Sequence, residues 1–124
     1  MNTVVVGRAL SALAIAFLAF DTAIKLVQMS VVAETLSALG YPRDLGFTIG
    51  VVELVCVVLY AVPRTAVLGA ILLTALFGGG IATHIRVGDP LFTHILFGVY
   101  LGLFVWGGLY LRNARVRELL PLAR

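Results

Sequence analysis

Residues 45–62 read LGFTIGVVELVCVVLYAV, an apolar run in which Glu53 is the one charged side chain. The run is slightly shorter than the roughly 20 residues that a helix needs to span a bilayer. Gly46, Gly50, Glu53 and Tyr60 share one face of this helix, because they follow one another at spacings near one or two turns. Small residues on a membrane helix allow another helix to come close. We therefore expect Glu53 to point into a helix bundle.

Three further apolar runs lie at about residues 4–26, 65–85 and 91–111. Hydrophobic residues make up 61% of the chain and charged residues 12%, whereas soluble domains contain about 45–50% and about 25%. The sequence therefore predicts an all-α membrane protein, a four-transmembrane-helix bundle that forms a single domain over residues 1–124, with a basic tail at 112–124. This composition excludes a soluble nucleotide-binding or protease-like domain. It also predicts no nucleic-acid partner, because the basic residues do not form a patch with interleaved aromatics.

A short amphipathic segment separates the first two runs. Val32, Leu36 and Leu39 recur at helical spacing, Gly40 follows as a stop signal, and Pro42 lies just beyond it. We expect a short interfacial helix here, between the first and second membrane helices. The two later connections are short enough for tight turns between antiparallel neighbours.

Two aspartates precede predicted helices. Asp44 stands just before the run at 45–62, and Asp89 stands before Pro90 at the start of the last run. Aspartate is a favoured N-cap and proline a favoured first helical residue. We expect both aspartates to cap the helices that follow them.

The distribution of basic residues predicts the orientation. If both termini and the turn at Pro63 lie on one side, that side carries Arg8, Arg64, Arg112, Arg115, Arg117 and Arg124. The opposite side carries Lys25, Arg43 and Arg86. The positive-inside rule then predicts cytoplasmic N- and C-termini in a multi-pass protein of a cytoplasmic (inner or plasma) membrane. Apolar residues precede Arg8, so we expect the first run to span the membrane rather than to act as a cleaved signal peptide.

Ionisable residues gather near the outer end of the predicted bundle. Counting about 1.5 Å per helical residue, four ionisable residues lie within about 12 Å of the outer surface: Asp21, Glu53, His84 and His94. Each of the four helices brings such a residue to this layer. We expect a polar, ligand-binding pocket that opens outward and is partly covered by the interfacial helix. Its predicted members are Asp21, Lys25, Glu53, His84, Arg86 and His94.

Each of these residues also has a structural interpretation. An acid inside the membrane is costly, which makes Glu53 a functional candidate, but a hydrogen bond to His94 or an ion pair with Lys25 or Arg86 would simply lock the helices together. Asp21 and Lys25 have the spacing of a helical ion pair, in which the two charges neutralise each other. Cys56, the single cysteine, is expected to be a small buried packing residue without a disulfide or thiol-exchange role.

A metal or haem site is not indicated. His84, His94 and Glu53 are the ligand types of a two-histidine, one-carboxylate metal site, but their spacing matches no metal motif. Haem ligation by both histidines is also disfavoured, because a tight turn joins their helices. We expect no metal and identify no cofactor from the residues.

Several short motifs carry a family resemblance over nearly the whole chain. They are Leu39-Gly40-Tyr41-Pro42, Glu53, Tyr60 with Pro63, Leu68-Gly69-Ala70, Gly78-Gly79, His84-Ile85-Arg86, Gly88 and Pro90. In these the chain resembles the DoxX-like family of small four-span bacterial membrane proteins. That family is named after a small subunit of an archaeal terminal quinol oxidase and thiosulfate:quinone oxidoreductase system. The resemblance implies a bundle in the cytoplasmic membrane that acts as an accessory redox subunit, with Glu53, His84 and Arg86 at family-pattern positions.

Three functional hypotheses follow. The first is a non-enzymatic membrane subunit or ligand-binding module, which holds a quinone or another lipophilic ligand, or contacts an oxidoreductase partner subunit or a second copy of itself. The second is a membrane-embedded acid–base enzyme that acts on a lipophilic small molecule, with Glu53, His84 and His94 as catalytic candidates. The third is a small proton-coupled transporter, disfavoured because the deep acid lies in the second span and Asp21 in the first is paired.

Overall fold

The computed structural model describes residues 2–123, and within them the secondary structure is helical, without strands. The α-helices are α1 (Thr3–Leu26), α2 (Ser30–Ala38), α3 (Gly46–Ala61), α4 (Ala66–Val87), α5 (Phe97–Arg112) and α6 (Ala114–Leu119). A 3₁₀ turn, η1 (Pro63–Thr65), precedes α4, and a π-helical turn, η2 (Leu91–Ile95), precedes α5.

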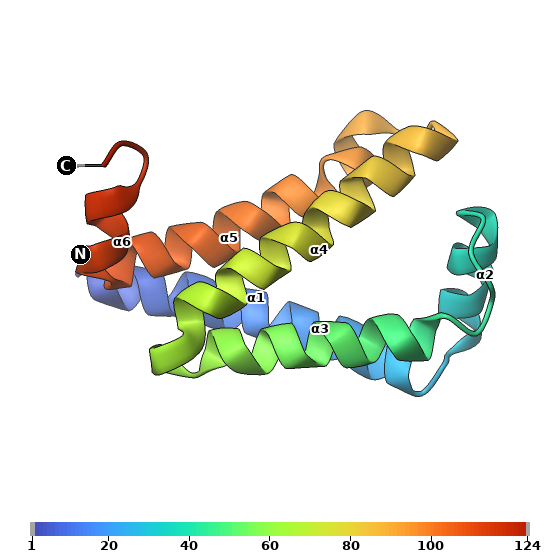
Figure 1. Ribbon diagram of the computed structural model, residues 1–124, viewed down its shortest axis with the longest axis horizontal. Coiled ribbons are helices and arrows are strands. Elements are labelled where there is room, and N and C mark those ends of the chain that lie inside the picture. Colours follow the sequence, from blue (N-terminus) through green and yellow to red (C-terminus); the bar gives the residue numbers. More distant parts are fainter. Residues whose placement is uncertain (1, 124) are drawn as a thin grey trace.

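The four long helices form a bundle (Figure 1). α1 packs against α3 and α5, and α4 packs against the same two helices, so α1 and α4 lie diagonally across the bundle. Both termini and α6 lie at one end, and α2 lies at the other (Figure 1). This arrangement places the two chain ends on the same side of the bundle as the turn at Pro63, as the sequence predicts.

Three helical segments are long and apolar enough to cross a membrane. They are Thr3–Leu26, Pro63–Val87 and Leu91–Arg112, and α3 is a further apolar helix of 16 residues. The predicted helical runs are therefore present, with ends that differ from the expected ones by a few residues. Only about a fifth of the residues in each of these three segments are buried inside the protein, which leaves broad apolar surfaces suited to contact with lipid.

The expected short helix between the first two runs is present as α2. Gly40 ends it with a φ of 87°, a backbone conformation that glycine adopts without strain. The N–H of Tyr41 then donates to the carbonyl of Leu36 over 2.9 Å, which closes the helix end. Val32 and Leu36 are buried, and Val32 packs against Gly46 at the start of α3.

The predicted aspartate caps are wrong. Leu45 occupies the N-cap position of α3, without a side-chain hydrogen bond, and Asp44 does not cap that helix. Pro90 precedes the π-helical turn, while Asp89 turns back and bonds His84 instead. Asp89 does not cap the following helix because Gly88, with a φ of 75°, reverses the chain and brings Asp89 onto the end of α4.

Part of the basic tail forms a further helix, α6. Asn113 ends α5 in an extended conformation, and its side-chain oxygen accepts from the N–H of Arg115 over 2.9 Å, which caps α6. Val116 is buried against α5, and Arg117 donates to the carbonyl of Tyr110. Asn113 thus both ends α5 and caps the start of α6.

The bundle is closely packed at the end that carries the termini. Tyr60, Leu73, Val105 and Leu109 are fully buried there. The hydroxyl of Tyr60 donates to the carbonyl of Val105 over 2.7 Å and lies 2.8 Å from the hydroxyl of Ser11. These bonds join α1, α3 and α5 through one side chain.

Glycines permit the closest helix contacts at this end. A Cβ atom on Gly69 of α4 would lie 2.3 Å from the backbone nitrogen of Tyr60 on α3. Gly7 of α1 and Gly108 of α5 meet in the same way. In the other half of α4, by contrast, a Cβ on Gly78, Gly79 or Gly80 would meet no atom within 4 Å. The interior is therefore tight near the termini and open toward α2.

We predict that Gly69→Leu destabilises the bundle, because its side chain collides with backbone and forces α3 and α4 apart. The expected loss is about 1–3 kcal/mol or more in the free energy of unfolding. Gly78→Leu, on the same helix but facing open space, is the matched control and should be nearly neutral. Thermal unfolding followed by circular dichroism in detergent checks both variants. Equal melting temperatures would contradict the packing described for α3 and α4.

Candidate functional site

A cavity of about 720 Å³ occupies the half of the bundle that lies toward α2. Every helix from α1 to α5 contributes to its wall. The apolar part of the lining includes Phe17, Leu18, Phe77, Phe97 and Leu101. The polar part includes Asp21, Lys25, Thr35, Glu53, Thr83, His84 and His94. Cavities of about 300–1,000 Å³ with mostly apolar walls and a few polar groups are typical of small-molecule sites.

The polar residues of the lining gather at one level of the cavity. Phe17 and Leu18 precede Asp21 by about one turn on α1, and Phe77 precedes His84 by two turns on α4. Toward the α2 end the wall carries these polar residues beside apolar ones such as Leu36, Leu39 and Ile49, and toward the middle of the bundle it is apolar. The cavity therefore has a mostly apolar lining, with its polar groups gathered in the half nearer α2.

Lys25 is bonded to two carboxylates. Its Nζ lies 2.6 Å from Oδ2 of Asp21 and 2.8 Å from Oε1 of Glu53. The second oxygen of Glu53 accepts from the hydroxyl of Thr22 over 2.7 Å. Glu53 is only 2% exposed, and both of its oxygens have partners. We refer to Asp21, Lys25 and Glu53 as the ion triad.

The ion triad corrects one expectation and extends another. The sequence predicts that Asp21 and Lys25 neutralise each other, but the single positive charge of Lys25 is shared with Glu53. The structural alternative of an ion pair between Glu53 and Lys25 is confirmed, and it joins α1 to α3. Gly50 permits this contact, because a Cβ there would lie 3.0 Å from Cβ of Lys25.

Sequence reasoning missed Thr22, which completes the bonding of Glu53. A signal for it exists in the sequence. The buried residues of α1 are Gly7, Ser11, Ala14, Leu18 and Thr22. They follow one another at spacings of three or four residues, so a stripe of mostly small residues marks the face on which Thr22 meets α3.

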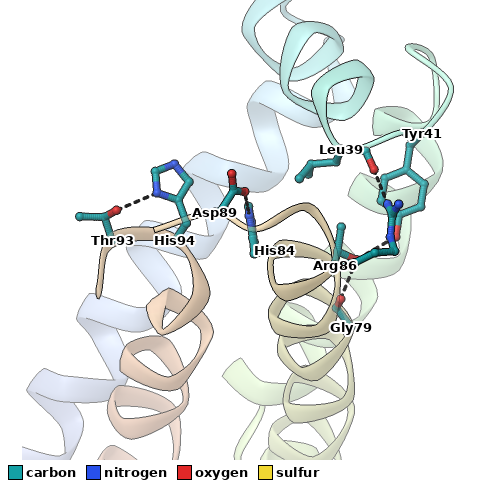
Figure 2. A network of polar contacts seen from close by, with 9 residues as sticks. Leu39, Tyr41, Gly79, His84, Arg86, Asp89, Thr93 and His94 are labelled. Atoms are coloured by element: carbon teal, nitrogen blue, oxygen red, sulfur yellow. Dashed lines mark hydrogen bonds and ion pairs between the residues drawn. The ribbon is translucent and has the colours of Figure 1, made fainter. Parts of the chain in front are cut away.

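The two histidines form a second polar group near the turn between α4 and α5 (Figure 2). Nδ1 of His84 lies 2.5 Å from Oδ2 of Asp89. Because a carboxylate only accepts, Nδ1 carries the hydrogen and Nε2 of His84 is left for another partner. The ring of His94 stands edge-on to that of His84, with centroids 5.7 Å apart. Since His84 lines the cavity, its Nε2 is available to hydrogen-bond a molecule there.

Arg86 lies at the rim and does not line the cavity. Its guanidinium donates to the carbonyl of Leu39, at the end of α2 (Figure 2). The hydroxyl of Tyr41 lies 2.8 Å from that of Thr83, one turn before Arg86 on α4. These two contacts tie the end of α2 to α4 across the cavity rim. Sequence reasoning placed Arg86 in the pocket and did not predict the contact between Tyr41 and Thr83.

The structure thus brings five of the six predicted residues to one cavity, in two separate groups. Asp21, Lys25 and Glu53 contact one another, and His84 lies beside His94. Within residues 2–123 no three side chains of histidine, cysteine, aspartate or glutamate lie close enough together to hold a metal ion. Cys56 is buried in the core, one turn from Glu53.

Long apolar helices around an open, mostly apolar cavity with a few polar groups define a small helical membrane protein. The chain belongs to the DoxX-like family, whose family model matches residues 9–108. The matched region contains the ion triad, both histidines and α2. No curated protein and no solved structure matches the chain.

We predict that Lys25→Met destabilises the protein, because it leaves Asp21 and the buried Glu53 without their counter-charge. Removal of one partner from a buried ion pair costs on the order of 3 kcal/mol. Unfolding in detergent measures this loss, and Arg64→Met in the exposed turn at Pro63 is the control. The double variant Lys25→Met with Glu53→Leu should regain part of the lost stability. A double variant as unstable as Lys25→Met alone would show that the pairing is not the cause.

Proposed function

We propose that this protein is a ligand-binding subunit of the membrane whose cavity holds an amphipathic, lipophilic small molecule such as a quinone. The observation that carries the proposal is the amphipathic lining of the cavity. Its apolar wall suits a hydrocarbon body, and the ion triad and His84 suit a polar head group. A soluble metabolite would not need the apolar half, and a plain hydrocarbon would not need the polar one.

The proposal includes a placement in the membrane. All four long helices cross the bilayer, with both termini in the cytoplasm and the cavity open toward the outer side. α3, at 16 residues, extends about 24 Å, and apolar Leu45 and Val62 flank it. Its packing between α1 and α4 supports a parallel course through the membrane. The arginines that gather at the terminal end support the cytoplasmic location of that end.

A redox role is the further part of the proposal. The DoxX-like family membership supports an accessory subunit of a quinone-linked oxidoreductase, in a cytoplasmic-type membrane. In that role the protein would hold the lipophilic ligand for a partner subunit that carries the redox group. The broad apolar surfaces of α1, α4 and α5 leave room for such a partner or for a second copy of the chain.

Native mass spectrometry of the protein released gently from its own membrane tests this proposal. A co-purifying flavin- or haem-bearing chain supports the accessory role. A retained lipophilic compound supports the cavity as the binding site and identifies the ligand. A chain that carries neither, and that binds no added decyl-benzoquinone, contradicts the proposal.

We predict that Gly80→Leu abolishes ligand binding without loss of stability. Gly80 lines the cavity, and a Cβ atom there would meet no other atom within 4 Å, so we expect leucine to fit without a clash and to fill space that the ligand would occupy. Gly78→Leu is the matched control, because Gly78 has the same free space but is not part of the cavity wall. Titration of decyl-benzoquinone into both variants measures the effect. Equal affinity in both would place the ligand outside this cavity.

A further inference from the structure

The ion triad leaves hydrogen-bonding capacity that faces the cavity. An ammonium group has three N–H donors, and Lys25 uses two of them, for Asp21 and Glu53. Asp21 bonds Lys25 through Oδ2, and its Oδ1 has no hydrogen-bond partner among residues 2–123. The side chain of Asp21 is 30% exposed, in contrast to the saturated and buried Glu53. One donor and one acceptor, on groups that touch each other, therefore remain for a ligand.

The charges of the ion triad select among polar head groups. A carboxylate or phosphate could accept from Lys25, but it would stand beside two acidic side chains. An ammonium could donate to Asp21 and would be attracted by the formal charge of −1 that two carboxylates and one lysine leave, but it has no lone pair with which to accept from Lys25. An ether or a carbonyl could accept from Lys25 and would leave Asp21 unpaired. A hydroxyl is neutral and both accepts and donates, so it alone among these groups satisfies both residues.

Aromatic side chains adjoin the ion triad on its apolar side. Phe17 lies one turn before Asp21 on α1 and also lines the cavity. Its ring packs edge-on against that of Phe97, with centroids 5.4 Å apart. Opposite α1 across the bundle, Gly79 and Gly80 contribute bare backbone to the wall. A flat ring attached to the hydroxyl would fit between these surfaces.

We propose that the cavity selects a lipophilic phenol. Its hydroxyl accepts from Lys25 and donates to Oδ1 of Asp21, and its ring lies against Phe17. This inference rests on the proposed function and narrows it within the same cavity. A quinone carries carbonyls and no O–H, so it would accept from Lys25 alone and bind less tightly than a phenol of the same size. Asp21 is then the residue that distinguishes a phenol from an ether or a carbonyl compound of the same size.

A pair of matched ligands tests this proposal. 4-Decylphenol and its methyl ether, 4-decylanisole, differ in the O–H that Asp21 would accept. Each is titrated calorimetrically into the full-length protein in phosphatidylcholine nanodiscs, with empty nanodiscs as the blank. Because hydrogen bonds to charged groups are the strong ones, we expect the phenol to bind at least about 10-fold more tightly. In Asp21→Ala the affinity for the phenol should fall to that for the ether, and the affinity for the ether should equal that of the wild-type protein. Lys25 keeps Glu53 as its partner in this variant.

Asp44→Ala, which removes an exposed acid outside the cavity, is the control and should keep the 10-fold preference. Equal affinity of wild-type protein for phenol and ether overturns the inference but leaves the proposed binding function in place. An equal loss of affinity for both ligands in Asp21→Ala also overturns the inference, since Asp21 would then affect only the shape of the cavity. Failure of the wild-type protein to bind either compound counts against the proposed function itself, and the phenol preference falls with it.

Discussion

The bonding of Lys25 to two carboxylates is the constraint on which the rest of the structure depends. Charged groups inside an apolar bundle are stable only when paired, and one ammonium shared between Asp21 and Glu53 fixes both the distance and the rotation of α1 relative to α3. That rotation in turn places Thr22 against Glu53 and Phe17 in the cavity wall. The position of the acidic groups in the cavity wall therefore depends on a single cation.

Glycine serves two opposite purposes in the bundle. Near the termini, Gly69 lets backbone approach backbone, and the interior there is filled by Tyr60 and Leu73. Toward α2, Gly79 and Gly80 face nothing within 4 Å and widen the space between diagonal helices. Other glycines of the α2 half, such as Gly50 and Gly98, still permit close contacts, so the same residue type brings helices together at some positions and leaves open space at others. Composition alone does not reveal this difference, because it depends on which face of α4 meets α3.

Much of the fold could be predicted from the sequence, because apolar runs and helical spacing are local properties. The face of Gly46, Gly50 and Glu53 and the spacing of Asp21 and Lys25 belong to this kind of signal. The choice of partners could not be predicted, because it depends on helix rotation and on how the chain turns. From the sequence, His94, Lys25 and Arg86 were all possible partners of Glu53, and the structure pairs it with Lys25. Asp89 has the sequence position of a cap, but the left-handed turn at Gly88 carries it to His84.

The burial of Cys56 has a practical consequence. It is the single cysteine of the chain and only 4% exposed, so the native protein presents almost no accessible thiol. A cysteine introduced at Ala114 in α6, or at Ser37 in α2, would be the accessible thiol on its side of the bundle. In the membrane placement proposed above, a maleimide that does not cross membranes would label one of these positions in intact cells and spare the other. Because its own cysteine is buried, the chain needs no prior cysteine removal for a labelling experiment that determines which end faces the cytoplasm.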